Sequence, residues 1–281
     1  MSSFGLNLGT GLSVALAAAS TSVFAVDVTD NAATTAREFA QERRDAAFRM
    51  KSGTLRPLDE VRSPTVKLAQ GVGVDYSDAD VRSTTLPFRF SFLTAHEPGS
   101  TDWYKFFVQG DGLTRSTQVG LKMSGFADLK LGVASPLMPN FIPALIGTAV
   151  LTIPTRGDFG SRLAAQTLKL AYSHDLAVGD KGAWSTTLVG ALNHFNARSP
   201  VAGKTSQFLY ADINYTYPGG SVVAFHLSRS HRKGSGTTNG MGVQWDFFKI
   251  AEKLDASLML NRSVSTGSRH TGVQFDLIYN L

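Results

Sequence analysis

The sequence predicts an all-β fold: an up-and-down antiparallel transmembrane β-barrel of about twelve strands, preceded by a helical arm. Three observations lead there. Segments of about ten residues alternate apolar and polar side chains from residue 66 onward. No run of eighteen apolar residues occurs, so no helix could cross a bilayer. The last segment, 270–281, carries an apolar face on alternate positions up to the final residue, with Val273, Phe275, Leu277, Tyr279 and Leu281.

Composition agrees with such a barrel. Only 17% of the 281 residues are charged, and the mean hydropathy is close to zero at -0.03. A membrane barrel hides its apolar residues by alternation, so this average is expected. The absence of cysteine removes disulfides, zinc-thiolate sites and thiol nucleophiles. The net charge of +5 is spread along the chain, which gives no indication of nucleic-acid binding.

The first 65 residues are expected to form two parts that lie outside the barrel. Residues 1–25 are typical of a secretory signal, with an apolar run at 12–19 and small side chains before a cleavage point after Ala25. An alanine-rich buried helix is the alternative. Residues 26–65 are expected to form a helical arm, centred on 31–50, and a linker with Pro57 and Pro64. The arm could lie in the periplasm, plug the lumen, contact a partner or rest in solvent against the barrel end, and the last is favoured.

Residues 66–281 form the predicted barrel. Counting from residue 86 gives twelve strands, an even number that places both barrel ends on the periplasmic side. Segment 66–76 also alternates and is left over from this count. The expected strands are 86–92, 104–109, 117–123, 129–133, 143–153, 163–174, 183–195, 207–217, 221–230, 240–248, 254–264 and 270–281.

Connection lengths support this interpretation. Counted backward from a periplasmic C-terminus, several outer connections are longer than their inner neighbours, as in outer-membrane barrels. Two connections break the pattern: the inner one around Gly179 is expected to be long, and the outer turn at Ser124 and Gly125 to be tight.

The terminal strand resembles the C-terminal assembly signal of bacterial outer-membrane barrels, with Leu281 where Phe or Trp is commoner. This resemblance implies that the barrel-assembly machinery is a partner. It also implies the bacterial outer membrane as the location.

Three short motifs carry a second resemblance. They are Gly125-Phe126-Ala127-Asp128-Leu129-Lys130-Leu131-Gly132, Pro143-Ala144-Leu145 and Leu151-Thr152-Ile153-Pro154-Thr155. Their spacing resembles that of the proteobacterial barrel family known as the transporter of the meta-pathway of phenol degradation. Arg156 stands where that family usually has Gly. The resemblance implies an outer-membrane channel or transport-type protein, and a hydrophobic or aromatic solute only through the family's name.

Alternation also predicts which charged side chains face the lumen. Mixed signs in a narrow lumen favour internal ion pairs that partly fill it, because buried charges need partners. The alternative is a selectivity lining for a small polar or anionic solute. The predicted lumen-lining residues are Arg89, Lys105, Lys122, Asp128, Lys130, Lys169, Asp212, Asp246 and Asp276, with His226 on the same face.

Expected outer loops are basic, and expected strand ends are aromatic. The basic set could meet the phosphates of lipopolysaccharide or stay solvated; it consists of Arg156, Arg162, Arg198, Lys204, Arg232, Lys233 and Arg269. The aromatic residues are expected to form interfacial girdles; they are Trp103, Tyr104, Trp184, Tyr215, Tyr217, Trp245 and Tyr279.

One pattern points to catalysis. His226-Leu227-Ser228 has the His-x-Ser spacing of outer-membrane phospholipases and lipid A deacylases, with Asn239 or Asn214 as the group that orients the imidazole. Those families usually have Asn after the Ser, and this chain has Arg229. The apolar residues Val223, Phe225 and Leu227 are expected to face lipid, so the alternate residues His226 and Ser228 are expected to face inward.

No phosphate-binding loop, calcium loop or set of histidines with metal-ligand spacing is present, so neither cofactor nor metal is expected. The favoured function is therefore a non-catalytic channel for a small solute. The alternative is an outer-membrane lipid hydrolase.

Overall fold

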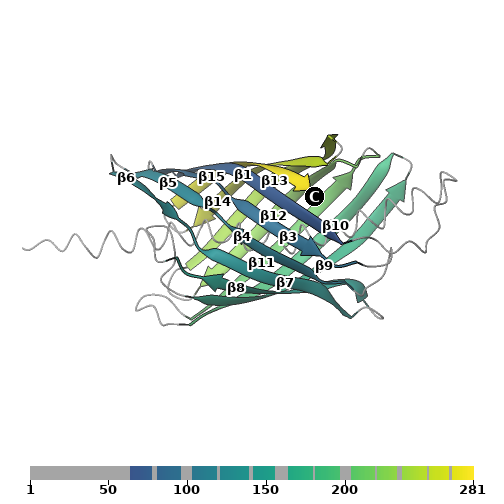
Figure 1. Cartoon of the computed structure of the whole chain (residues 1–281), viewed down its shortest axis with the longest axis horizontal. Helices are drawn as coiled ribbons and strands as arrows, with labels where there is room; N and C mark the ends of the chain where they lie inside the picture. The colour runs from purple at the N-terminus through teal and green to yellow at the C-terminus, as the bar shows by residue number, and fades with distance from the viewer. Residues whose placement is uncertain are drawn as a thin grey trace, which may run out of the picture.

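The computed structural model describes residues 64–77, 81–95, 103–118, 121–138, 142–155, 164–179, 181–196, 204–218, 220–232, 236–251, 253–265 and 268–281. The predicted signal (1–25) and almost all of the predicted arm and linker (26–65) lie outside these residues. The described chain forms one closed antiparallel barrel whose strands are tilted to its long axis (Figure 1). Within the described residues, no helix is long and apolar enough to cross a bilayer.

Fifteen strand segments make up the wall. In chain order they are β1 (Thr65–Ser77), β2 (Val81–Thr85), β3 (Phe88–Leu93), β4 (Lys105–Gly110), β5 (Leu113–Gln118), β6 (Leu121–Phe126), β7 (Leu129–Met138), β8 (Ile142–Ile153), β9 (Ala165–Gly179), β10 (Gly182–Phe195), β11 (Thr205–Thr216), β12 (Val222–Arg232), β13 (Gly236–Ala251), β14 (Leu254–Ser265) and β15 (Ser268–Asn280).

The barrel closes between its first and last strands. β1 pairs with β15 from Lys67 opposite Asn280 to Ser77 opposite His270. Segment 66–76, which the sequence count left over, is therefore the first barrel strand. Closure pairs the first strand with the last, as a sheet in lipid requires; among the described strands, β6 pairs on one side only, with β5.

Three strands are interrupted midway, which reduces fifteen segments to twelve barrel strands. β2 continues into β3, β4 into β5 and β6 into β7, and each composite strand pairs with its neighbour on both sides of the break. The predicted strand 117–123 is wrong, because it spans the turn between β5 and β6. Ser124 and Gly125 lie inside β6 rather than in a turn. The count of twelve is confirmed. Two divisions behind it were wrong: segment 66–76 is a strand and was left out, and 117–123 is not a strand and was counted.

A β-bulge lies at one of these breaks. Thr85 is opposite Thr114 and Phe88 is opposite Gly110, so three residues, 111–113, face only two, 86–87. Gly112 has φ 56°, a left-handed conformation that favours glycine. A side chain there would collide with the Leu86 carbonyl oxygen. Pro87 lies in the partner strand beside the bulge; it has no N–H to leave unpaired.

The connection around Gly179 is shorter than the sequence suggested. β9 ends at Gly179 and β10 begins at Gly182, so only residues 180–181 join them. The extra length belongs to the strands themselves, which extend beyond the predicted 163–174 and 183–195. Gly182, the first residue of β10, has a φ of 145°, a backbone conformation that favours glycine.

The two faces of the wall differ as the alternation predicted. Large apolar side chains such as Leu168, Leu188, Leu209, Phe225 and Leu277 are exposed on the outer face. The alternate positions are buried and mostly polar or small, for example Thr187, Asp212, Asn214, Thr216 and Ala224. An apolar exterior around a polar interior is the arrangement of a transmembrane barrel, and the fold prediction is confirmed.

The two ends of the barrel are chemically distinct. We call the end at which β1 begins and β15 ends the proximal end, and the opposite one the distal end. Outer-face aromatic rings gather at the proximal end: Trp184 contacts Tyr215 at 4.9 Å between ring centroids, Tyr215 contacts Tyr217 at 4.8 Å, and Trp245 stacks on Phe247 at 4.4 Å. Tyr104 and Tyr279 are exposed there too. Trp103 is the exception in the predicted girdle, because it is only 3% exposed and lies in the interior.

Lipid-facing positions should tolerate charge according to their depth. Leu188 lies midway along β10, whereas Leu176 lies near the proximal end of β9, and both face outward. We expect Leu188→Arg to destabilise the barrel by about 2–4 kcal/mol and Leu176→Arg by about 0–1 kcal/mol. Guanidinium unfolding of the two variants in lipid vesicles measures this difference. Equal losses would contradict the assignment of the outer face to lipid.

Candidate solute pathway in the barrel lumen

The structure places the predicted lumen-lining residues on the inner wall wherever it describes their side chains. Lys105, Asp128, Lys130, Lys169 and Asp212 are buried. Arg89, Asp246 and Asp276 are half-buried on inward positions of β3, β13 and β15. The side chain of Lys122 lies outside the described residues. Lys105, Lys130 and Lys169 each have at least one polar, ring or electrostatic contact, so these cations are packed against other groups. A role in selectivity stays a prediction.

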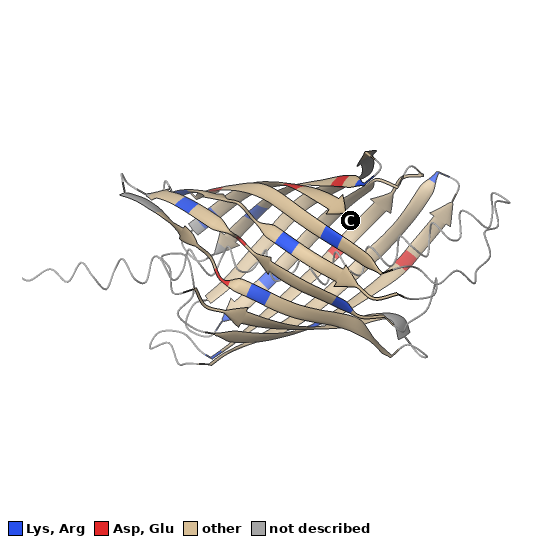
Figure 2. Ribbon diagram, in the orientation of Figure 1, with Lys and Arg blue, Asp and Glu red and all other residues tan. Residues whose placement is uncertain are grey.

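The inner charges are unevenly distributed around the barrel. Basic and acidic positions occur along the length of the wall (Figure 2). Among the described side chains, β1 to β9 contribute five inward cations, namely Lys67, Arg89, Lys105, Lys130 and Lys169, together with Asp75 and Asp175, and Asp128 lies in the break between β6 and β7. Strands β10 to β15 contribute Asp212, Asp246, Asp255 and Asp276, with Arg232 as the single described inward Lys or Arg. Opposite walls of the lumen therefore carry an excess of opposite charge.

Two of these cations belong to one row of directly paired residues. Reading across β4, β7, β8, β9, β10 and β11, the register gives Lys105, Ala134, Thr148, Lys169, Ala191 and Phe208. All six side chains are buried. The Thr148 hydroxyl lies between the two lysines in this row and has no hydrogen-bond partner. We call this set the lysine row. Sequence analysis missed it, because no spacing along the chain shows which strands are neighbours.

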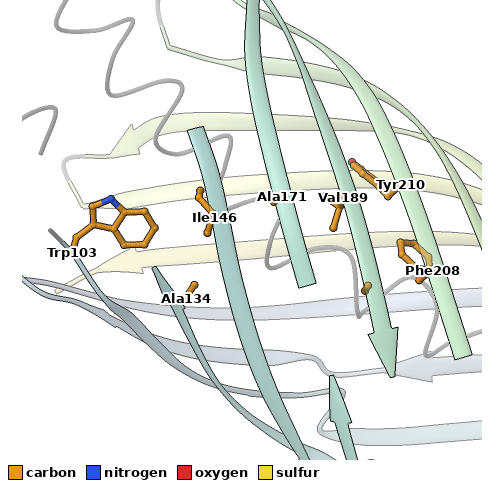
Figure 3. Packing of buried hydrophobic residues seen from close by; sticks show 8 residues of the cluster. Trp103, Ala134, Ile146, Ala171, Val189, Phe208 and Tyr210 are labelled. Carbon is orange, nitrogen blue, oxygen red and sulfur yellow. The ribbon is translucent and has the colours of Figure 1, made fainter. Parts of the chain in front are cut away.

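An apolar cluster adjoins the lysine row inside the barrel. Its side chains project from the inner wall of β7 to β11, and Trp103 joins from the segment before β4 (Figure 3). Ile146, Val189 and Tyr210 are its larger members beside Phe208. Large apolar residues on inward positions depart from the polar interior expected of a barrel. The available signal was the parity of Ile146 and Val189, which is opposite to that of the outward residues Leu151 and Leu188.

Asp212 is a buried carboxylate of the inner wall whose two oxygens both accept hydrogen bonds. One oxygen accepts hydrogen bonds from the Thr187 backbone N–H at 2.9 Å and the Asn214 side-chain amide at 2.6 Å. The other accepts from the Tyr210 hydroxyl at 3.0 Å. Asp212 is 2% exposed, and these donors balance the cost of burying its charge. The network holds Tyr210 against the wall and so fixes one side of the apolar cluster.

Two of the sequence motifs that resemble the transporter family meet in space. The Thr155 backbone N–H donates to an Asp128 carboxylate oxygen at 3.1 Å, and the Thr155 hydroxyl donates to the Phe126 carbonyl at 3.0 Å. Asp128 is almost fully buried. The aspartate and threonine of these motifs therefore fasten the distal end of β8 to the break between β6 and β7, which is a structural role.

The alternative catalytic residues lie on both faces of the wall. His226 is buried on the inner wall, directly opposite Asp212, and its ring stacks on Tyr210 at 5.4 Å between centroids. Ser228 is half-buried on the same face, whereas Asn239 is exposed on the outer face. Asn239 is therefore on the wrong side of the wall to orient His226. Asn214 faces inward, but its amide donates to Asp212.

Among the described residues, no group of three or more His, Asp or Glu side chains could hold a metal ion. A groove of about 560 Å³ lies on the outer wall, where Gly190 and Ala211 sit among Leu145, Leu170, Leu188, Leu209 and Leu227. It faces lipid rather than the lumen, so it is not part of a solute path.

Comparison with solved structures finds similarity to several outer-membrane proteins. An outer membrane channel from Pseudomonas putida F1 superposes with a TM-score of 0.57 and 18% sequence identity, covering 81% of this chain and all of that one. The KdgM porin in complex with oligogalacturonate gives 0.43 and 11%, covering 76% and 99%. The CymD monoaromatic hydrocarbon channel gives 0.40 and 8%, covering 79% and 89%. No protein-family model and no curated protein matches the sequence.

The Pseudomonas structure shares the fold of this chain across the whole barrel. At this level of identity the likeness concerns the fold, which agrees with the resemblance seen in the sequence. The likeness does not identify a solute.

Removal of the Asp212 carboxylate should destabilise the barrel measurably. Asp212→Ala leaves the Tyr210 hydroxyl, the Asn214 amide and the Thr187 N–H without their acceptor, and we expect a loss of about 3 kcal/mol or more, since each of the three orphaned donors costs roughly 1–3 kcal/mol. Asp212→Asn keeps one acceptor oxygen and should lose less. Urea unfolding in detergent micelles gives both values. An Asp212→Ala variant as stable as the parent would show that the network contributes nothing.

Proposed function

We propose that this protein is a non-catalytic channel in the outer membrane of a Gram-negative bacterium, passing a small solute through its lumen. One observation carries the proposal: the described strands form a closed barrel with an apolar outer wall and a charged, polar inner wall. A sheet of this kind has only lipid as a suitable surrounding for its exterior. Its interior is then the only polar route across the membrane.

The chemistry of the two ends supports an orientation. Both termini of the barrel lie at the proximal end, which we assign to the periplasm. The aromatic rings of that end occupy the position of an interfacial girdle. The terminal strand β15 alternates up to Leu281, whose N–H donates to the Val66 carbonyl at 2.8 Å. We infer that β15 is the strand read by the barrel-assembly machinery during insertion.

The lumen also indicates the class of solute. The lysine row provides two ammonium groups, and the apolar cluster provides Ile146, Val189, Phe208 and Tyr210 directly beside them. A solute with an apolar body and an anionic group would satisfy both surfaces at once. Many of the inner side chains are buried, and we infer that permeation requires some of them to move aside.

Neutralising the lysine row should reduce anion permeation. An ammonium about 4 Å from an anion contributes about 1 kcal/mol in water and about 4 kcal/mol at the dielectric constant of a protein surface. We therefore expect Lys105→Met/Lys169→Met to lower anion over cation permeability roughly fivefold or more. Reversal potentials in planar bilayers with a salt gradient measure this ratio. A matched control is Lys181→Gln, because Lys181 is exposed in the proximal turn between β9 and β10.

The same recordings test the proposal as a whole. A purified, folded barrel that conducts no current and releases no anionic aromatic solute from vesicles would overturn the channel. A conducting barrel whose ion preference is unchanged by the two lysine substitutions would retain the channel but remove the anionic solute.

Absence of catalysis is a separate part of the proposal, supported by the inward direction of His226 and by Asn239 on the opposite face. We expect the purified protein to release no fatty acid from phospholipid or lipid A, and Ser228→Ala to leave both this baseline and the conductance unchanged. Hydrolysis that disappears in Ser228→Ala would instead establish the enzyme.

A further inference from the structure

Charged side chains on the outer wall are sorted by sign. Among the strand residues whose side chains the structure describes, every acidic one faces the lumen, and the five charged ones on the outer face are arginines. They are Arg82, Arg115, Arg229, Arg262 and Arg269, and all are exposed. All five lie in the distal halves of their strands. Charge in contact with lipid is costly, so a set of one sign at one depth requires an explanation.

Four of these arginines lie on adjoining strands across the barrel seam. Arg262 on β14 is opposite Thr271 on β15, which makes Arg269 its diagonal neighbour. Arg82 on β2 is opposite Thr117 on β5, which makes Arg115 its diagonal neighbour. Diagonal neighbours of this kind are about 7–8 Å apart, within reach of long side chains. We call these four residues the arginine cluster.

Tyr76 joins the two halves of the arginine cluster. It is directly opposite Thr271 on one side and Arg82 on the other, so Arg262, Thr271, Tyr76 and Arg82 form one continuous row. With strands about 4.8 Å apart, the two arginines of that row are separated by about 14 Å at the backbone. Tyr76 is 56% exposed between them, as suits an aromatic side chain at a membrane interface.

We propose that the arginine cluster binds the phosphate groups of a glycolipid in the outer leaflet, that is, a lipid of the lipopolysaccharide type. Guanidinium groups pair with phosphate through two parallel hydrogen bonds. The cluster lies on the outer face near the distal ends of its strands, where lipid headgroups surround a membrane barrel, so we expect its anionic partner to be part of a lipid. Two arginine pairs about 14 Å apart suit a headgroup that carries more than one phosphate.

This site differs from the one expected from sequence. The predicted set was placed in outer loops, and Arg156, Arg162, Arg198 and Lys233 lie outside the described residues. Arg232 faces inward and its guanidinium lies 4.0 Å from the Phe195 ring centroid. Of that set only Arg269 belongs to the arginine cluster; the other members come from the strands. The inference rests on placement in the outer membrane, which is part of the proposed function, but not on solute passage.

The test uses the full-length folded protein in detergent, with purified lipopolysaccharide as the probe. Two double variants, Arg82→Gln/Arg115→Gln and Arg262→Gln/Arg269→Gln, remove one half of the cluster each. We expect each to weaken lipopolysaccharide binding roughly tenfold or more, and the weakening to shrink at high salt. Lys181→Gln is the control, because Lys181 is exposed in the proximal turn between β9 and β10, at the other end of the barrel from the cluster. A difference in migration between boiled and unboiled samples on sodium dodecyl sulfate gels verifies that every variant is folded.

Three further measurements decide the ligand. Dephosphorylated lipopolysaccharide should bind as weakly to the parent protein as intact lipopolysaccharide binds to the double variants. Inorganic phosphate and phosphatidylcholine vesicles should not compete. Arg262→Lys/Arg269→Lys should bind at an intermediate level, since lysine keeps the charge without the two-pronged geometry. Equal binding of lipopolysaccharide by the parent and both glutamine variants would overturn the proposal, as would equal binding of the dephosphorylated form or full competition by inorganic phosphate.

Conductance separates this proposal from the channel. The double glutamine variants should conduct like the parent, because the cluster faces away from the lumen. Loss of lipopolysaccharide binding with normal conductance supports the site, whereas a barrel that binds lipopolysaccharide through the cluster but never conducts would remove the channel and leave the site standing.

Discussion

The structure depends on the pairing of β1 with β15. A sheet in lipid has no water to hydrogen-bond the backbone groups of an open edge, so the first strand must pair with the last. The seam runs along most of both strands, from Lys67 and Asn280 to Ser77 and His270. Once the wall is closed, successive side chains of each strand point alternately toward the lipid and toward the lumen. The separation of Leu277 from Asp276, and of Leu168 from Lys169, follows from this choice alone.

Closure also explains the sorting of charge. A carboxylate on the lipid face would lie close to the anionic phosphates of the membrane interface and would have no neutralising partner there. Inside, Asp212 has three donors and Asp128 has the Thr155 N–H. An arginine near the distal rim can extend its guanidinium toward the headgroups, which is why the outer wall tolerates Arg and not Asp. Carboxylates are therefore found in the lumen, where hydrogen-bond donors are available, and outward arginines near the headgroups, where anions are available.

Sequence periodicity was sufficient for the features that depend on one strand at a time. It placed Lys130, Lys169 and Asp212 inward because each lies on the polar parity of a regular strand. It failed between residues 111 and 128, where the parity changes within a strand: Gln109 is buried inside and Arg115 is exposed outside, although both are odd-numbered. A strand was therefore predicted across the β5 to β6 turn. The lysine row and the arginine cluster were out of reach for another reason, since both are defined by neighbours across the sheet.

The bulge that breaks the alternation in this region also places Arg115 on the outer face. One extra residue opposite Leu86 and Pro87 reverses the faces of everything distal to it on that strand. Without it, Arg115 would continue the inward series of Lys105, Phe107 and Gln109 and would add another cation to the lumen. With it, the proximal half of the composite strand contributes Lys105 to the lysine row, while the distal half contributes Arg115 to the lipid face. A single irregularity, fixed by the left-handed Gly112, therefore lets one strand supply cations to both sides of the wall.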